Sequence, residues 1–198
     1  MAVSMEQIKL LREKTNAGVL NCKNALNESN GDIDKAVDIL RKKGMSVAAK
    51  KSTRTAKQGC VESYIHPGGK IGVLVEINCE TDFVARNEHF KQLVKDIAMH
   101  IAATNPLYLK KEDVPEEVID KEKEIFRALA KGKPEHILEK MLAGKINKFC
   151  QQVCLLEQAF VKDDKITIKD YVTSVIAKVG ENILIKRFTC YHLGIVDK

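Results

Sequence analysis

The sequence has no tryptophan, and aromatic residues make up only 5% of its 198 positions. Aromatic and basic residues are nowhere clustered together, so the stacking platform of single-strand nucleic-acid binders is missing. No apolar run approaches the roughly 20 residues that a transmembrane helix needs. The N-terminus, residues 1–6, has neither the basic start nor the apolar core of a signal peptide. We therefore expect a cytoplasmic protein with no membrane partner.

The motifs of common enzyme classes are missing as well. There is no glycine-rich phosphate loop, no Gly-x-Ser-x-Gly elbow and no His-Glu-x-x-His helix. The six cysteines form no Cys-x-x-Cys pair, and Cys150 and Cys154 lack the nearby histidines that a zinc site would need. His89 lies near Cys79, so a thiol enzyme is one alternative, although a buried strand cysteine is the simpler interpretation. We predict a binding protein that is not an enzyme and uses no cofactor or metal.

The positive charge is concentrated in one short segment. The whole chain carries a net charge of +6, yet residues 41–57 contain seven lysines or arginines and no acidic residue. Such a run is usually a solvated connector and sometimes an anion-binding arm. An RNA-binding protein that uses residues 41–57 is therefore a second alternative. A hydrophobic fraction of 44% and a charged fraction of 30% are typical of an ordinary globular protein.

The first 44 residues predict a compact bundle of three helices. Ser4 to Gln7 fits a capping box, and Asp32 is suited to cap the third helix. Gly44 stands where a helix commonly ends. Residues 45–57 then form a basic linker, part of which, residues 47–51, could be helical.

Residues 58–198 predict an α+β core. Residues 58–66 and 71–77 alternate between apolar and polar side chains on either side of a Pro-Gly-Gly turn, which predicts an antiparallel hairpin. Further helices are expected up to Thr104 and over 115–131, 134–153 and 167–180, with a brief edge strand at 106–109 and a last strand at 183–188. The fold class is therefore α+β, in which a three-helix bundle is joined by a basic linker to a small antiparallel sheet packed with helices.

The segment from Asn78 to Phe90 connects the hairpin to the first core helix. It places an apolar residue, Phe83, directly after the cap-forming types Thr81 and Asp82. The ring could be tucked under the first helical turn or presented to a partner. Because phenylalanine is usually buried, the residue type alone favours the tucked ring.

Residues 78–87 read Asn-Cys-Glu-Thr-Asp-Phe-Val-Ala-Arg-Asn, and this segment resembles the bacterial elongation factor Ts family. The resemblance covers essentially the whole chain, and its other segments include 10–15, 22–26, 95–103, 153–158 and 179–183. It implies a ubiquitin-associated-like N-terminal bundle and a single core copy, as in the short members that pair as homodimers. It also implies a guanine-nucleotide exchange factor for elongation factor Tu in translation elongation.

The resemblance implies two regions of contact with that GTPase. The residues matched by Asp82 and Phe83 enter the GTPase near its magnesium site, which requires an exposed ring, and Asp82 is expected to cap the following helix. The bundle is implied to contact the nucleotide domain through positions at which this family usually has bulkier methionines in place of Val19 and Leu20. The predicted partner-binding residues are Arg12, Val19, Leu20, Thr81, Asp82, Phe83 and Val84.

The bundle also suggests a third alternative, a ubiquitin-binding protein. Ubiquitin-binding relatives usually carry Met-Gly-Phe or Leu-Gly-Tyr in the first loop. This chain has Ala17-Gly18-Val19 there, which disfavours ubiquitin as a partner.

Overall fold

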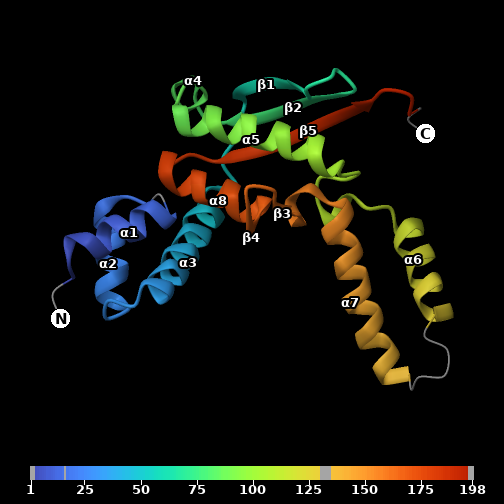
Figure 1. Ribbon diagram of the computed structural model, residues 1–198, viewed down its shortest axis with the longest axis horizontal. Helices are drawn as coiled ribbons and strands as arrows, with labels where there is room; N and C mark the ends of the chain where they lie inside the picture. Colours follow the sequence, from blue (N-terminus) through green and yellow to red (C-terminus); the bar gives the residue numbers. More distant parts are fainter. Residues whose placement is uncertain (1–2, 16, 130–134, 196–198) are drawn as a thin grey trace. The chain divides into compact units, whose positions relative to one another are not determined.

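The computed structural model describes residues 3–15, 17–129 and 135–195 (Figure 1). Over these residues the chain forms eight α-helices, five β-strands and two short 3-10 helices, which confirms the α+β class. By its internal contacts the chain divides into two compact units. The first comprises residues 1–60, 77–93 and 170–184, and the second comprises residues 61–76, 94–169 and 185–198. Within the described ranges, no helix combines the length and the apolar character that a membrane crossing requires.

Three helices open the first unit: α1 (Met5–Thr15), α2 (Val19–Glu28) and α3 (Ile33–Lys51). The capping box at the start of α1 is confirmed. The Gln7 backbone N–H donates to Ser4 Oγ at 3.1 Å, and the Ser4 backbone N–H donates to Gln7 Oε1 at 3.0 Å. Two donors that a helix start leaves without partners are satisfied in this way.

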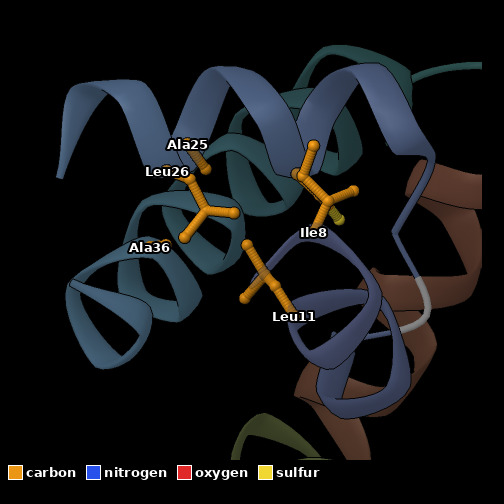
Figure 2. Close-up of a cluster of buried hydrophobic side chains, with 6 residues drawn as sticks. Ile8, Leu11, Ala25, Leu26 and Ala36 are labelled. Carbon is orange, nitrogen blue, oxygen red and sulfur yellow. The ribbon is translucent and has the colours of Figure 1, made fainter. Parts of the chain in front are cut away.

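The three helices share one apolar core (Figure 2). Its fully or nearly buried members are Ile8, Leu11, Cys22, Ala25, Leu26 and Ala36. Together with partly buried Ile33, Val37 and Leu40 of α3, these apolar side chains recur at helical spacing along each segment, and this is why the sequence pattern predicted the bundle. Its likeness to ubiquitin-associated domains stays a prediction, as does the division into residues 1–44, 45–57 and 58–198.

The predicted end of the third helix at Gly44 is wrong. Asp32 caps α3 as expected, by accepting from the Lys35 backbone N–H at 3.0 Å, but the helix continues to Lys51. Gly44 is buried inside it, facing Ala177 and Thr173 of α8 (Ile168–Val179). The glycine therefore allows helices to approach closely and does not end one.

A three-stranded sheet has the order β1 (Gln58–Ile65), β2 (Ile71–Cys79), β5 (Ile183–His192). The predicted hairpin is confirmed, since the His66 backbone N–H donates to the Ile71 carbonyl across the turn. The central strand β2 buries Val73, Val75, Ile77 and Cys79 on one face. This alternation follows from the two-residue period of a strand.

Strand β5 lies antiparallel to β2. Arg187 Nε lies 2.7 Å from Glu76 Oε2, and the Leu193 backbone N–H donates to the Lys70 carbonyl at 2.8 Å. The residue just after β5 therefore lies beside the residue just before β2, while Arg187 within β5 lies beside Glu76 within β2, which is the pattern of antiparallel neighbours. The last strand is longer than the predicted 183–188.

Helix α5 (Glu88–Thr104) confirms the predicted apolar stripe. The stripe residues, all of which are fully buried, are Phe90, Leu93, Val94, Ile97, Ala98 and Ile101.

The elements between α5 and α8 belong to the second unit. They are 3-10 helices Lys111–Asp113 and Leu155–Glu157, α6 (Glu116–Leu129), α7 (Glu135–Val153), β3 (Ala159–Phe160) and β4 (Asp163–Thr167). Strands β3 and β4 pair antiparallel and were not expected from the sequence. The expected edge strand at 106–109 is reduced to one isolated bridge between Tyr108 and Cys154. The predicted end of one helix at residue 131 and start of the next at residue 134 lie outside the described residues.

Candidate functional site

The segment after β2 forms one short helical turn, α4 (Asp82–Ala85), ahead of α5 (Figure 1). Thr81 is its N-cap, and the Thr81 Oγ1 atom accepts from the Val84 backbone N–H at 3.5 Å. The side chain of Val84 is 9% exposed and anchors the turn. The sequence predicted a single helix here, whereas Asn87 starts a separate one by accepting from the His89 backbone N–H at 2.8 Å.

Asp82 does not cap a helix, so this prediction is wrong. The preceding residue, Thr81, occupies the cap position, and Asp82 is the first helical residue. The Asp82 carboxylate instead lies 2.8 Å from Arg86 NH2, one turn further along. Both side chains are well exposed, so this ion pair contributes little to stability. It does keep a half-exposed carboxylate beside Phe83.

The Phe83 ring points away from the protein. Its side chain is 80% exposed, the largest fraction among the large apolar residues described. The expectation of a tucked ring, which came from the residue type alone, is wrong, and the exposed ring implied by the family resemblance is confirmed. Val84 takes the inward position that residue type would have assigned to Phe83. An exposed benzene ring on a capped turn is a feature that proteins use for contact with partners.

Two glutamates hold the strand end from which α4 begins. Glu181 receives two hydrogen bonds from Thr81: from the hydroxyl at 2.7 Å and from the backbone N–H at 3.0 Å. Glu80 receives the Asn182 backbone N–H at 2.6 Å, and its other oxygen lies 3.5 Å from Arg54 NH1. The segment that follows β2 and the segment that precedes β5 are thus joined by hydrogen bonds to two carboxylates, one from each segment.

The bundle presents the second predicted surface, which we call the bundle surface and define as Arg12, Val19 and Leu20. Arg12 is an exposed residue of α1. Val19 and Leu20 open α2 and are 48% and 69% exposed, although both are apolar. The bundle core therefore leaves these side chains outward, where they are available to a partner. They belong to the same compact unit as Phe83.

The geometry of Cys79 argues against a thiol enzyme. The thiol is fully buried and donates to the Thr81 carbonyl at 3.1 Å. Burial raises the pKa of the Cys79 thiol to about 11, and the neighbouring Glu181 carboxylate and Cys60 thiol add to the rise. A nucleophilic cysteine needs its thiolate stabilised, and here the thiolate is disfavoured. Among the described residues, no group of three or more histidine, cysteine or acidic side chains could hold a metal ion.

Four of the seven basic residues in 41–57 contact the protein itself. Arg41 NH2 lies 2.6 Å from Asp170, and Lys43 lies 2.8 Å from Glu28. Lys51 donates to the Gly180 carbonyl. The fourth is Arg54, already described beside Glu80. A segment engaged in this way is a structural connector more than a phosphate-gripping arm, which requires unengaged cations along one face.

Sequence reasoning missed Glu181 and its neighbours as site residues. Thr81 and Glu181 are 100 positions apart, and no local pattern predicts that a loop will meet a distant strand end. The only signal was the resemblance of residues 179–183 to the family, which gave the loop no role.

A family model described as elongation factor TS matches residues 5–194 of this chain. Elongation factor Ts of Carboxydothermus hydrogenoformans is 57% identical over 194 residues, which cover 97% of this chain and 89% of the relative. The protein of the same name from Thermotoga neapolitana is 57% identical over 194 residues and 98% of both chains. That of Geobacter sulfurreducens is 54% identical over 196 residues, or 98% of this chain and 91% of the relative. The similarity spans both the α4 segment and the bundle surface.

Proposed function

This chain belongs to the elongation factor Ts family, and from that premise we propose that it is a guanine-nucleotide exchange factor for elongation factor Tu. The observation that carries the proposal is the 80% exposed Phe83 ring on a turn whose cap and flanks are fixed. The protein makes and breaks no covalent bond in this role. It acts in translation elongation and therefore in the cytoplasm.

The mechanism follows from thermodynamic linkage. GDP is held in a GTPase by backbone groups of the phosphate loop and by a magnesium ion that bridges phosphate oxygens and protein. A factor that binds the nucleotide-free GTPase more tightly than the GDP form weakens GDP binding by the same ratio. A ten-thousandfold weakening needs a difference of about 5.5 kcal/mol in affinity for the two states.

Phe83 and Asp82 supply part of that difference beside the magnesium site of the GTPase. The ring is already exposed, so its insertion into an apolar gap removes benzene surface from water without unpacking the factor's own core. The half-exposed carboxylate of Asp82 lies next to it and brings negative charge near the ion and the phosphates. Neither group needs to ligate the magnesium ion in order to disturb it.

The bundle surface supplies the grip that makes ring insertion effective. Val19 and Leu20 are exposed apolar side chains of the same three-helix bundle that carries the always-charged, exposed Arg12. Arginine is enriched at protein interfaces, and the two apolar side chains would lose water-exposed surface when a partner covers them. Both are shorter than methionine, so we expect a shallower contact here than in family members with methionine. The remaining predicted contact residues, Thr81 and Val84, act by holding α4 in shape.

The direct test mixes the protein with elongation factor Tu that carries fluorescent GDP, in the presence of excess unlabelled nucleotide. We expect the rate of GDP release to rise with the concentration of the factor and to reach a plateau. A release rate that stays at the spontaneous value would refute the proposal. Salt dependence separates the RNA-binding alternative: the stimulation of GDP release should fall only modestly from low to high salt, whereas RNA affinity through residues 41–57 would fall steeply.

A further inference from the structure

Helix α4 cannot hold its own shape. It has four residues, and a single helical turn is unfavourable in water because nucleation fixes several dihedral angles for one hydrogen bond. The only buried residue of the turn is Val84, at 9% exposure. The direction in which Phe83 points must therefore be set by groups outside the turn.

Glu181 is the strongest of those groups. Both of its carboxylate oxygens accept from Thr81, one from the hydroxyl at 2.7 Å and the other from the backbone N–H at 3.0 Å. Hydrogen bonds to an ionised acceptor are about twice as strong as neutral ones, and two of them fix an orientation as well as a distance. Thr81 is the N-cap of α4 and lies two residues before Phe83, so its conformation sets the position from which the Phe83 side chain extends.

The same loop, residues 180–182, also contacts the end of the helix that leaves the bundle. Lys51, the last residue of α3, donates to the Gly180 carbonyl. The Asn182 side-chain amide donates to the Arg54 carbonyl at 2.9 Å. Gly180 has a φ of +77°, a conformation that favours glycine and turns the chain sharply at this point.

Two further contacts tie the bundle helix to the helix that precedes this loop. Arg41 of α3 forms an ion pair of 2.6 Å with Asp170 of α8. Gly44 of α3 faces the α8 side chains at a distance at which an added methyl group would be in van der Waals contact. All of these residues lie in the first compact unit.

From these contacts we infer that Glu181 is a positioning residue for Phe83, and that the loop of residues 180–182 fixes the ring relative to the bundle surface. The inference rests on the proposed function, because it concerns how the two halves of one interface act together. When the bundle surface is bound, a ring held in place needs no further ordering to reach its target. A ring on a loose turn must be ordered at that moment, at a cost in free energy.

The loss of Glu181 should therefore affect the maximal rate of GDP release more than the concentration needed for half of it. In Glu181→Ala, Phe83 and the bundle surface are chemically intact, but Thr81 loses both acceptors. We expect the maximal rate of release from elongation factor Tu to fall about tenfold, which corresponds to about 1.4 kcal/mol. Glu181→Gln retains one carbonyl oxygen as an acceptor and should recover a substantial part of the rate.

The experiment compares Glu181→Ala in the parent protein and in a Phe83→Ala background. If Glu181 acts through the ring, its removal should lower the rate in the parent and change it less than about twofold when the ring is already absent. The matched control is Glu157→Ala, which removes another half-buried carboxylate, one that pairs with Lys111 at 3.2 Å in the second unit. This control should leave the rate of GDP release unchanged.

The outcomes separate the two proposals. If Phe83→Ala releases GDP as fast as the parent, the proposed function is wrong. If Phe83→Ala is slow while Glu181→Ala is as fast as the parent, only the positioning role is wrong. If Glu181→Ala lowers the rate equally with and without the ring, Glu181 acts on the fold as a whole and the inference is overturned. Should Glu181→Ala fail to fold, Glu181→Gln in both backgrounds provides the same comparison.

Discussion

The Phe83 ring is exposed because its neighbours occupy the positions that would otherwise bury it. Val84 faces inward at 9% exposure, and Thr81 is held by Glu181. With Thr81 and Val84 fixed, the Phe83 side chain between them points outward from the turn. Residue type could not reveal this, since average burial says nothing about which of two adjacent apolar residues faces the core. The family resemblance supplied the correct expectation.

The buried imidazole of His100 gives the stability of this protein a dependence on pH. The His100 Nδ1 atom accepts from the Val161 backbone N–H at 3.3 Å, so the neutral ring carries its proton on Nε2, which donates to Gln158 Oε1 at 3.0 Å. Burial lowers the pKa of His100 below its ordinary value of 6.5, although the Gln158 contact opposes this shift. The folded protein therefore favours the neutral ring.

We predict that the free energy of unfolding falls as the pH is lowered from 6.5 towards the folded-state pKa of His100. In this window the unfolded chain binds a proton at this residue and the folded chain does not, so acid favours unfolding. Urea unfolding at a series of pH values measures the slope. His100→Gln, which cannot titrate, should flatten it, and an unchanged slope in that variant would show that other groups cause the dependence.

The six cysteines should separate into two classes of reactivity. Cys60 and Cys190 are half-buried, whereas Cys22, Cys79, Cys150 and Cys154 are buried. Burial raises the pKa of the Cys154 thiol to about 12 and also raises that of Cys22. With a chromogenic thiol reagent at neutral pH, we expect Cys60 and Cys190 to react first and the other four cysteines to react only after denaturation. Rapid labelling of Cys79 would contradict this and would revive the thiol-enzyme alternative.

At the scale of elements, local patterns predicted the helices and strands well and their ends less well. The capping box of α1, the Asp32 cap and the stripe of α5 were predicted because each depends on residues a few positions apart. Strands β3 and β4 were missed because they are two and five residues long, too short for a periodic signal. The pairing of β5 with β2 could be expected only in outline.

Gly44 shows why a helix end is hard to read from sequence. Glycine is common just past the end of a helix. Gly44 instead lies inside α3, at a position against which α8 packs. A methyl group at Gly44 would lie 3.8 Å from the Ala177 Cβ atom, an ordinary contact. The close approach of the two helices favours a small residue but does not demand glycine.

We therefore predict that Gly44→Ala raises the free energy of unfolding by about 0.5–1 kcal/mol, since alanine is the better helix former. Had Gly44 ended the helix in a left-handed conformation, the same change would destabilise the protein. Chemical denaturation distinguishes the two signs.

Gly59→Ala is the matched contrast. Gly59 has a φ of +133°, and an added Cβ would lie 2.1 Å from the Ile77 carbonyl oxygen. We expect Gly59→Ala to lower the free energy of unfolding by about 1–3 kcal/mol. If both glycines respond alike, the packing described for α3 and β1 is incorrect.

At the scale of the whole molecule, the family resemblance predicts that two copies of this chain associate. Light scattering coupled to size-exclusion chromatography should give twice the chain mass of 22.2 kDa. A mass of one chain at micromolar concentration would contradict the homodimer. It would leave the exchange proposal standing, because Phe83 and the bundle surface belong to one unit of a single chain.

The measurement that tests the account most directly is the rate of fluorescent GDP release from elongation factor Tu with the parent protein and with Phe83→Ala. The ring is 80% exposed, so its removal takes almost nothing from the core, and thermal unfolding should be unchanged. We predict a maximal rate at least about tenfold lower, the effect of losing one central interface side chain. Equal rates for two equally stable proteins would contradict the account.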